Sequence, residues 1–124
     1  MKHHDPEYLR QLLETKVCPK GELFGVDLSK ADLPKAVLYS SDLREAKLSK
    51  ANLAKADLQE ANLVGADLHR VDLNGANLRG SDSRATDFWK ANLKEAILRN
   101  ADLREANLWG CLLYTSPSPR DLDL

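Results

Sequence analysis

Acidic side chains at a regular spacing are the residues of this 124-residue chain best suited to chemistry. Paired carboxylates such as Asp57, Asp67 and Asp72 could serve as general acid and general base. However, Asn occupies the same place in other copies of the pattern, as at Asn52 and Asn62. An amide does not exchange protons as a carboxylate does, whereas both side chains accept a hydrogen bond in a turn. The interchange therefore indicates a turn residue and not a catalytic acid.

The remaining reactive side chains form no recognisable catalytic set. His3 and His4 are adjacent, which could suggest a metal pair or a tag remnant, but we interpret them as inert residues near the chain end. Cys18 and Cys111 are the two cysteines and form no CxxC motif, so Cys18 is expected to be a half-buried structural thiol. The sequence also contains no glycine-rich phosphate loop and no Ser/His/Asp set. It thus predicts a protein that is not an enzyme and that has no cofactor or bound metal.

Composition argues against several functional classes. The formal net charge of −1 gives no global attraction to nucleic acid or to an acidic membrane. No run approaches the roughly 18 apolar residues of a membrane span, and the N-terminus lacks the apolar core of a signal peptide. We therefore expect a single-domain cytoplasmic protein.

The regularly spaced carboxylates belong to a five-residue repeat that fills most of the chain. From Gly21 to Gly110 the sequence divides into 18 blocks in register, and the central residue is Leu in 16 of them, with Ser83 and Phe88 as the exceptions. Two residues earlier stands Ala in 12 blocks, and Asp or Asn lies between them in 14 blocks. The last two positions of each block vary and are mostly polar. Such self-similarity predicts a solenoid.

A five-residue period fits neither an α-helix nor a flat strand. On a helix each Leu would advance by about 140°, and on a strand Leu would change face at every repeat. The backbone must therefore turn a corner in every block, so that all central side chains share one core. The predicted core residues include Leu23, Leu28, Leu33, Leu43, Leu53, Leu63, Leu73, Phe88, Leu93 and Leu103. Ser83 and Phe88 stand in adjacent blocks, so the large ring should fill volume that Ser83 leaves, and the Ser83 hydroxyl needs a backbone acceptor or water.

The tandem motif A(D/N)LXX, as in ANLAKADLQEANLVG at residues 51–65, resembles the pentapeptide-repeat proteins over Gly21 to Gly110. This resemblance implies an all-β solenoid, namely a right-handed quadrilateral β-helix with four blocks in each coil. At four blocks per coil, the 18 blocks make about 4.5 coils. Residues 20 apart would then stack in columns along each wall.

Residues 1–20 are predicted to form a capping segment at the open N-terminal end of the solenoid. Asp5 is a good N-cap residue before Pro6, and a short helix from about Pro6 to Lys16 should follow. Its apolar face consists of Tyr8, Leu9, Leu12 and Leu13. This face would cover core side chains and unpaired backbone of the first coil.

Residues 111–124 form a second exceptional segment. The string CLLYTSPSPRD matches, residue for residue, one translated reading frame of a common transposase-based sequencing adapter. We interpret residues 111–124 as a non-native tail on a truncated metagenomic sequence, although Leu112 or Leu113 could still cover the last coil. The alternative is a native proline-rich linker.

The outward positions are where binding would occur, because they vary between blocks. On one wall, a column that ends in two Trp residues runs beside a column of basic residues. The candidate interaction surface comprises Lys30, Lys50, His69, Arg70, Trp89, Lys90 and Trp109. Exposed Trp beside cations is typical of protein interfaces and of sites that stack bases. The alternative is that the cations only aid solubility and that the Trp side chains shield each other.

Three functions compete. The first is a non-enzymatic scaffold for protein–protein interaction, with an unknown protein partner. The second follows from the resemblance: some family members imitate DNA, bind DNA gyrase and dimerise through the C-terminal end, which here implies a homodimer through a missing C-terminal end. Residues 21–110 hold 13 Lys and Arg against 14 Asp and Glu, which argues against DNA mimicry. The third is nucleic-acid binding through the basic stripe and the Trp pair, which would weaken steeply with salt.

Overall fold

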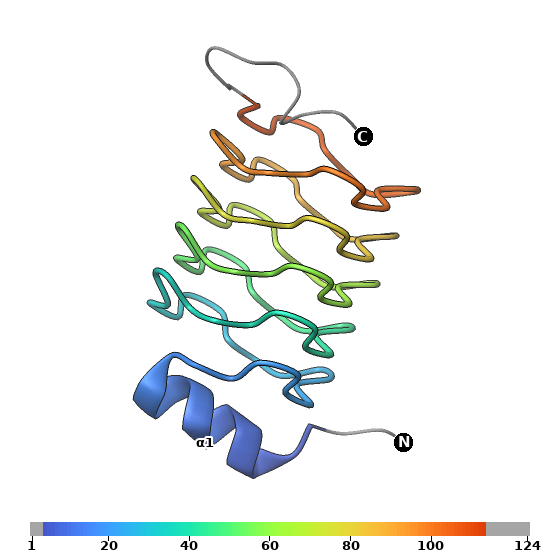
Figure 1. Ribbon diagram of the computed structural model, residues 1–124. Helices are drawn as coiled ribbons and strands as arrows, with labels where there is room; N and C mark the ends of the chain where they lie inside the picture. Colours follow the sequence, from blue (N-terminus) through green and yellow to red (C-terminus); the bar gives the residue numbers. More distant parts are fainter. Residues whose placement is uncertain (1–3, 114–124) are drawn as a thin grey trace.

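The computed structural model describes residues 4–113, whose coils stack along one axis beginning beside the helix α1, Pro6–Thr15 (Figure 1). His3 and residues 114–124 of the predicted tail lie outside the described residues. The β-pairing within the described range consists of isolated parallel bridges between successive coils. The architecture is therefore a solenoid, as the repeat predicted.

Each bridge joins residues that are 20 apart in the sequence, for example Asp57 with Asn77. The backbone bonds follow the same rule. The amide of Leu63 donates to the carbonyl of Asp82 at 2.7 Å, and the amide of Asp82 donates to the carbonyl of Ala61 at 2.9 Å. Because 20 residues contain four blocks, every coil has four sides.

The corner in each block is a hydrogen-bonded turn. The amide of Ala66 donates to the carbonyl of Leu63 at 2.9 Å, and Gly65 between them has a φ of 70°. One residue before Leu63, the Asn62 side chain accepts a hydrogen bond from the amide of Val64 at 3.1 Å. Asp carboxylates make the same bond in other blocks. The interchange of Asp and Asn therefore has the structural cause that the sequence indicated.

The central side chains form one continuous core. Those from Leu23 to Leu98, with Ser83 and Phe88 among them, are at most 3% exposed. Leu103 is only half-buried, because it lies in the last described coil. The Ser83 hydroxyl pairs with the Ser81 hydroxyl at 2.9 Å, a side-chain partner that the sequence analysis did not consider.

Local capping signals define both ends of α1. The Asp5 side chain accepts a hydrogen bond from the amide of Glu7 at 2.9 Å, and Pro6 is the first helical residue. At the other end Lys16 adopts a φ of 61°, and its amide donates to the carbonyl of Leu12 at 2.8 Å. The helix thus ends one residue before the predicted boundary.

A narrow apolar strip connects α1 to the first coil. Leu12 is fully buried, and Tyr8 and Leu9 are half-buried against the core. The Cys18 thiol lies 3.6 Å from the Tyr8 carbonyl, and Cys18 is fully buried, not half-buried as predicted. Leu13 is 52% exposed, so its predicted place in the apolar face is wrong. A helix lying across one end of a solenoid contacts it along a thin line of side chains, and Leu13 falls beside that line.

The bridges extend beyond the predicted repeat boundaries at Gly21 and Gly110. Val17 already forms a bridge to the next coil, and Leu112 still forms one to the coil before it. Both segments lack the Ala–Asp signature, so the motif gave no indication that they pair. The Leu112 side chain is 49% exposed despite this backbone pairing.

Asp and Asn side chains also contact each other between coils. The Asn52 amide group donates to Asp32 Oδ1 at 3.2 Å, and the Asn92 amide group donates to Asp72 Oδ1 at 3.3 Å. This column alternates carboxylate and amide, which avoids placing like charges at a separation of about 4.8 Å.

Truncation of one central side chain should show how strongly the core stabilises the stack. Leu58→Ala is expected to lower the free energy of unfolding by about 2–5 kcal/mol, since Leu58 is fully buried and the change leaves a cavity. The exposed Leu13→Ala is the control and should change it by less than about 0.5 kcal/mol. Chemical denaturation measures both values, and similar losses would contradict the burial pattern.

Asn52→Asp should destabilise the protein in a way that acid and salt relieve. The new carboxylate can still accept the Ala54 amide, which lies 3.0 Å from the Asn52 side-chain oxygen, but it stands between Asp32 and Asp72. Repulsion favours its protonated form in the folded state, so the loss of Tm should be present at pH 7 and disappear below about pH 3.5. Thermal unfolding at both pH values checks this. A loss that did not depend on pH would instead be assigned to the missing Asn52–Asp32 bond.

Candidate interaction face

The predicted surface residues lie on one wall, which we call the tryptophan face: Lys30, Lys50, His69, Arg70, Trp89, Lys90 and Trp109. The backbone hydrogen bonds between consecutive coils bring them together. The amide of Arg70 donates to the carbonyl of Trp89 at 2.8 Å, and the amide of Lys90 donates to the carbonyl of Trp109 at 2.9 Å. The four basic residues of this face are all exposed.

The two Trp side chains stack on each other. Their ring centroids are 6.0 Å apart and their planes differ by 13°. The Arg70 guanidinium carbon lies 5.1 Å from the Trp89 ring centroid, while the Lys90 ammonium lies 4.7 Å from that centroid and 5.8 Å from that of Trp109. Each such contact at an exposed site contributes about 0.5–1 kcal/mol. Trp109, which is 65% exposed, thus presents a large aromatic surface that its neighbours hold in place.

An acidic column runs beside these cations. Asp27, Asp67 and Asp87 belong to it, with Lys47 between the first two. The amide of Ser29 donates to Asp27 at 3.0 Å, and this backbone hydrogen bond lowers the pKa of Asp27. The tryptophan face is therefore mixed in charge. The sequence-based view, which followed only the last two positions of each block, missed this column.

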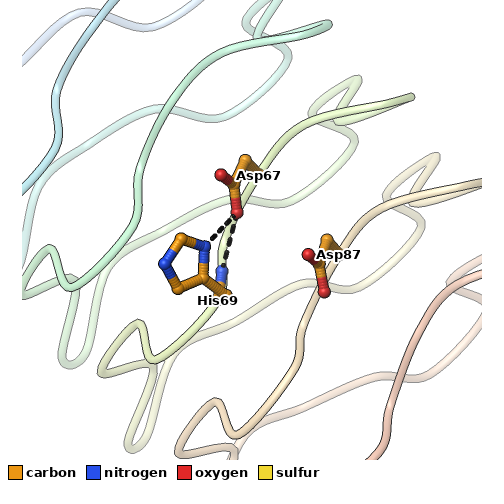
Figure 2. Close-up of side chains that lie close together, drawn as sticks. All are labelled: Asp67, His69 and Asp87. Atoms are coloured by element: carbon orange, nitrogen blue, oxygen red, sulfur yellow. Dashed lines mark hydrogen bonds and ion pairs between the residues drawn. The ribbon is translucent and has the colours of Figure 1, made fainter.

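Asp67, His69 and Asp87 come together from two consecutive coils of this wall (Figure 2). The His69 Nδ1 lies 2.6 Å from Asp67 Oδ1, and one donor atom from each of the three residues lies within 4.8 Å of the others. Carboxylate oxygen and imidazole nitrogen are common metal ligands. Among residues 4–113, this is the one group of three or more His, Cys, Asp or Glu side chains with donor atoms so close.

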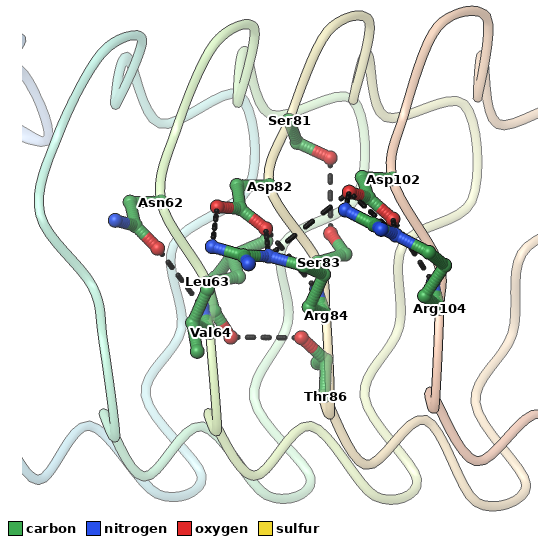
Figure 3. A network of polar contacts seen from close by, with 10 residues as sticks. All are labelled: Asn62, Leu63, Val64, Ser81, Asp82, Ser83, Arg84, Thr86, Asp102 and Arg104. Carbon is green, nitrogen blue, oxygen red and sulfur yellow. Dashed lines mark hydrogen bonds and ion pairs between the residues drawn. The ribbon is translucent and has the colours of Figure 1, made fainter.

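Another wall carries paired arginines and aspartates (Figure 3). Arg84 donates two hydrogen bonds of 2.8 Å to Asp82, and Arg104 Nη2 donates to Asp102 at 2.7 Å. Arg84 also lies 4.0 Å from Asp102. The hydrogen bonds from Arg104 lower the pKa of Asp102 to about 2, and those from Arg84 lower the pKa of Asp82. Each of these two arginines therefore neutralises the aspartate two residues before it.

The buried reactive groups make structural contacts. The Thr86 hydroxyl donates to the carbonyl of Leu63 at 2.7 Å, and Ser83 has the hydroxyl partner described above. Burial raises the pKa of the Cys18 and Cys111 thiols, which disfavours the reactive thiolate. No buried side-chain nitrogen or oxygen of residues 4–113 lacks a hydrogen-bond partner. These groups therefore stabilise the core and are not arranged as nucleophiles.

Comparison with models of protein families identifies eight copies of the pentapeptide repeat, in matches over residues 22–59, 46–82 and 84–114. The chain belongs to the pentapeptide-repeat family. A search of the curated proteins gave no match. Pentapeptide-repeat proteins form right-handed quadrilateral β-helices, in agreement with the four-sided coils described above.

Solved structures of other pentapeptide-repeat proteins are similar to this one. A protein from the thylakoid lumen of Arabidopsis thaliana has a TM-score of 0.72 at 29% identity, over 82% of this chain and 68% of its own. Rfr23 from the cyanobacterium Cyanothece 51142 has a TM-score of 0.58 at 26% identity, over 79% of this chain and 64% of its own. HetL from Nostoc, described as involved in the regulation of heterocyst differentiation, has a TM-score of 0.49 at 32% identity, over 81% of this chain and 49% of its own.

This chain spans about half to two thirds of the length of these three proteins. No helix within residues 4–113 is long and apolar enough to cross a membrane.

Sequence reasoning found the tryptophan face but missed two clusters of this pentapeptide-repeat protein. The Asp67–His69–Asp87 group joins residues two apart with a residue 20 further on. The Arg–Asp pairs have the local signature Asp-Leu-Arg or Asp-Ser-Arg, as at residues 82–84. The Arg–Asp signature is visible in the local sequence, whereas the Asp67–His69–Asp87 group becomes visible only when local spacing is read together with the coil period.

Removal of Arg104 should raise the pKa of Asp102. In Arg104→Gln we expect this pKa to move from about 2 toward the ordinary value of about 3.9, with Arg84 still retaining part of the shift. Because the depressed pKa belongs to the folded state, its contribution to stability is present above about pH 4 and is lost as the pH falls through 2. NMR titration of the Asp102 carboxyl group measures the change. Arg44→Gln, on the same wall but in an earlier coil, is the control, and an equal shift there would contradict the assignment.

Proposed function

We propose that this pentapeptide-repeat protein is a non-enzymatic scaffold that binds a protein partner through the tryptophan face. The main support is Trp109, which is 65% exposed yet fixed by its stack on Trp89 and by Lys90. A side chain that is already ordered loses little conformational entropy on binding. Trp and Arg also contribute most strongly to protein interfaces. A fitting partner would offer an apolar pocket for the Trp109 ring, with acidic groups near Lys90.

Nucleic-acid binding is the second candidate, favoured by the same exposed ring beside cations. Two observations favour a protein partner instead. Arg70 and Lys90 already lie over the Trp rings, and Asp67 and Asp87 stand beside them. A phosphate backbone would therefore meet carboxylates as well as cations along this wall.

A DNA mimic that binds gyrase has less support. Such mimicry needs a continuous negative surface, whereas 13 basic residues balance 14 acidic ones over residues 21–110. In addition, Arg44, Arg84 and Arg104 neutralise aspartates on their own wall. The role would require a far more acidic surface than this pentapeptide-repeat protein presents.

We also propose that α1 caps the first coil and that the repeat region forms a rod of about 4.5 coils or slightly more. The burial of Leu12 supports the cap, and the bridge at Leu112 supports the longer rod. The division into residues 1–20, 21–110 and 111–124 stays a prediction, as do the non-native tail, the cytoplasmic location and a homodimer through the C-terminal end.

A protein-fragment display library, screened with the purified chain, tests the proposed function. Selected binders should have an affinity for Trp109→Ala that is at least about 30-fold lower than for the wild type. This corresponds to a loss of about 2 kcal/mol in binding free energy, which is typical when a central interface residue is truncated. Tyr39→Ala, which truncates an exposed aromatic residue on a different wall, is the matched control and should bind like the wild type.

Equal affinity of the selected binders for Trp109→Ala would show that the tryptophan face is not the interface. Fluorescence anisotropy with labelled single-stranded and double-stranded nucleic acid, at 50 and 200 mM salt, tests the second candidate. Tight binding that falls steeply with salt and requires Trp109 would replace the protein-scaffold proposal by nucleic-acid binding.

A further inference from the structure

The second residues of the blocks form the bridges between consecutive coils. At three of these bridges both residues are acidic: Glu22 with Asp42, Asp82 with Asp102, and Asp67 with Asp87. Elsewhere in these columns, an Asp faces Asn, Lys or an apolar residue. Like charges at strand spacing repel each other, so an acidic pair is stabilised by a nearby cation.

Arginine supplies that cation at two of the three places. Arg44 pairs with Asp42 at 2.7 Å, and Arg84 pairs with Asp82 at 2.8 Å while lying 4.0 Å from Asp102 (Figure 3). In both cases the Arg stands two residues after an Asp and reaches back to it. The guanidinium is a permanent cation, so at least one carboxylate of each of these two pairs has a counter-charge at any ordinary pH.

The Asp67–Asp87 pair has no arginine. His69 stands two residues after Asp67, at the place that corresponds to Arg84, and its Nδ1 lies 2.6 Å from Asp67. Asp87 accepts hydrogen bonds from the Trp89 amide at 3.0 Å and from the Asn107 side chain at 3.3 Å, both of which are neutral donors. The imidazole that contacts Asp67 and lies near Asp87 is not a permanent cation.

We propose that Asp67, His69 and Asp87 bind a divalent transition-metal ion of the zinc type. Their donor atoms lie within 4.8 Å of one another on an accessible wall (Figure 2). Zinc binds nitrogen and oxygen ligands at about 2.0–2.2 Å, so small rotations of these side chains would close the site around an ion. Water completes the coordination. The ion neutralises the two carboxylates as arginine does elsewhere, while Lys47 faces only Asp67 from the preceding coil.

The imidazole ligand selects the kind of ion. Magnesium and calcium prefer shells made of oxygen ligands, whereas zinc, nickel and copper accept imidazole nitrogen. We therefore expect Zn²⁺ to bind and Mg²⁺ not to compete with it. This site goes beyond the proposed scaffold function, and its test does not depend on the identity of a partner.

Calorimetric titration with Zn²⁺ tests the site. The chain has 3 histidines, so a His3→Ala/His4→Ala background leaves His69 as the sole imidazole. This background should bind one Zn²⁺ per chain, and adding His69→Asn or Asp87→Asn should weaken binding by at least about tenfold. Asp82→Asn removes one carboxylate from an arginine-neutralised pair and should leave Zn²⁺ binding unchanged. The proposal is overturned if the background shows no saturable binding, if His69→Asn binds equally well, or if Mg²⁺ competes equally.

The effect of Zn²⁺ on the Tm provides a second test, because side chains with a purely structural role would not make the Tm depend on Zn²⁺. Without metal, Asp87→Asn should keep or raise the Tm, because the new side-chain oxygen can still accept a hydrogen bond from the backbone amide of Trp89. Asn107 makes the equivalent bond, at 3.1 Å, with the backbone amide of Trp109. The repulsion with Asp67 is also removed. Zn²⁺ should raise the Tm of the background but not that of Asp87→Asn. An equal Zn²⁺-dependent rise in both would contradict the site.

Discussion

The hydrogen-bond ladder between coils is the constraint on which the rest of the structure depends. Each coil has its amides and carbonyls paired with those of residues about 20 positions away, as where the Leu63 amide meets the Asp82 carbonyl. No coil can satisfy these groups alone, so the fold exists only as a stack. The same ladder sets equivalent side chains about 4.8 Å apart, inside and outside. The buried columns form the core, and the outer columns determine the surface chemistry.

Contacts within the outer columns behave like cross-strand pairs in an ordinary sheet. Trp89 on Trp109 is an aromatic pair, Asn52 on Asp32 is a hydrogen-bonded pair, and Asp82 near Arg84 and Asp102 is a charge network. In each case a residue's environment is defined by what stands one coil away. The surface is therefore a set of short vertical interactions, and its charge character changes from wall to wall although the repeat stays the same.

The sequence predicted those features that recur in every block. The core Leu residues were evident because burial tolerates little else there, and the turn role of Asp followed from its exchange with Asn. The tryptophan face required the four-sided coil that the family resemblance implied. Features that occur in only one place were missed: the Asp67–His69–Asp87 group, which joins two coils, and the Ser81–Ser83 hydroxyl pair, which lies within one block. The pairing of Val17 was missed because its segment departs from the motif, and Leu13 because its position on α1 depends on tertiary docking.

The four-sided coil has a consequence for how such a protein can change. Gain or loss of a single block keeps a Leu at every corner and so preserves the core, yet it shifts all later residues to the adjacent wall. Such a change between Arg70 and Trp89 would separate the cation from the ring while leaving Trp89 and Trp109, which remain 20 residues apart, in contact. Only a change of four blocks, or a multiple of four, returns the later residues to their original wall. A change in the number of blocks therefore alters which side chains are neighbours on the surface, while the fold stays constant.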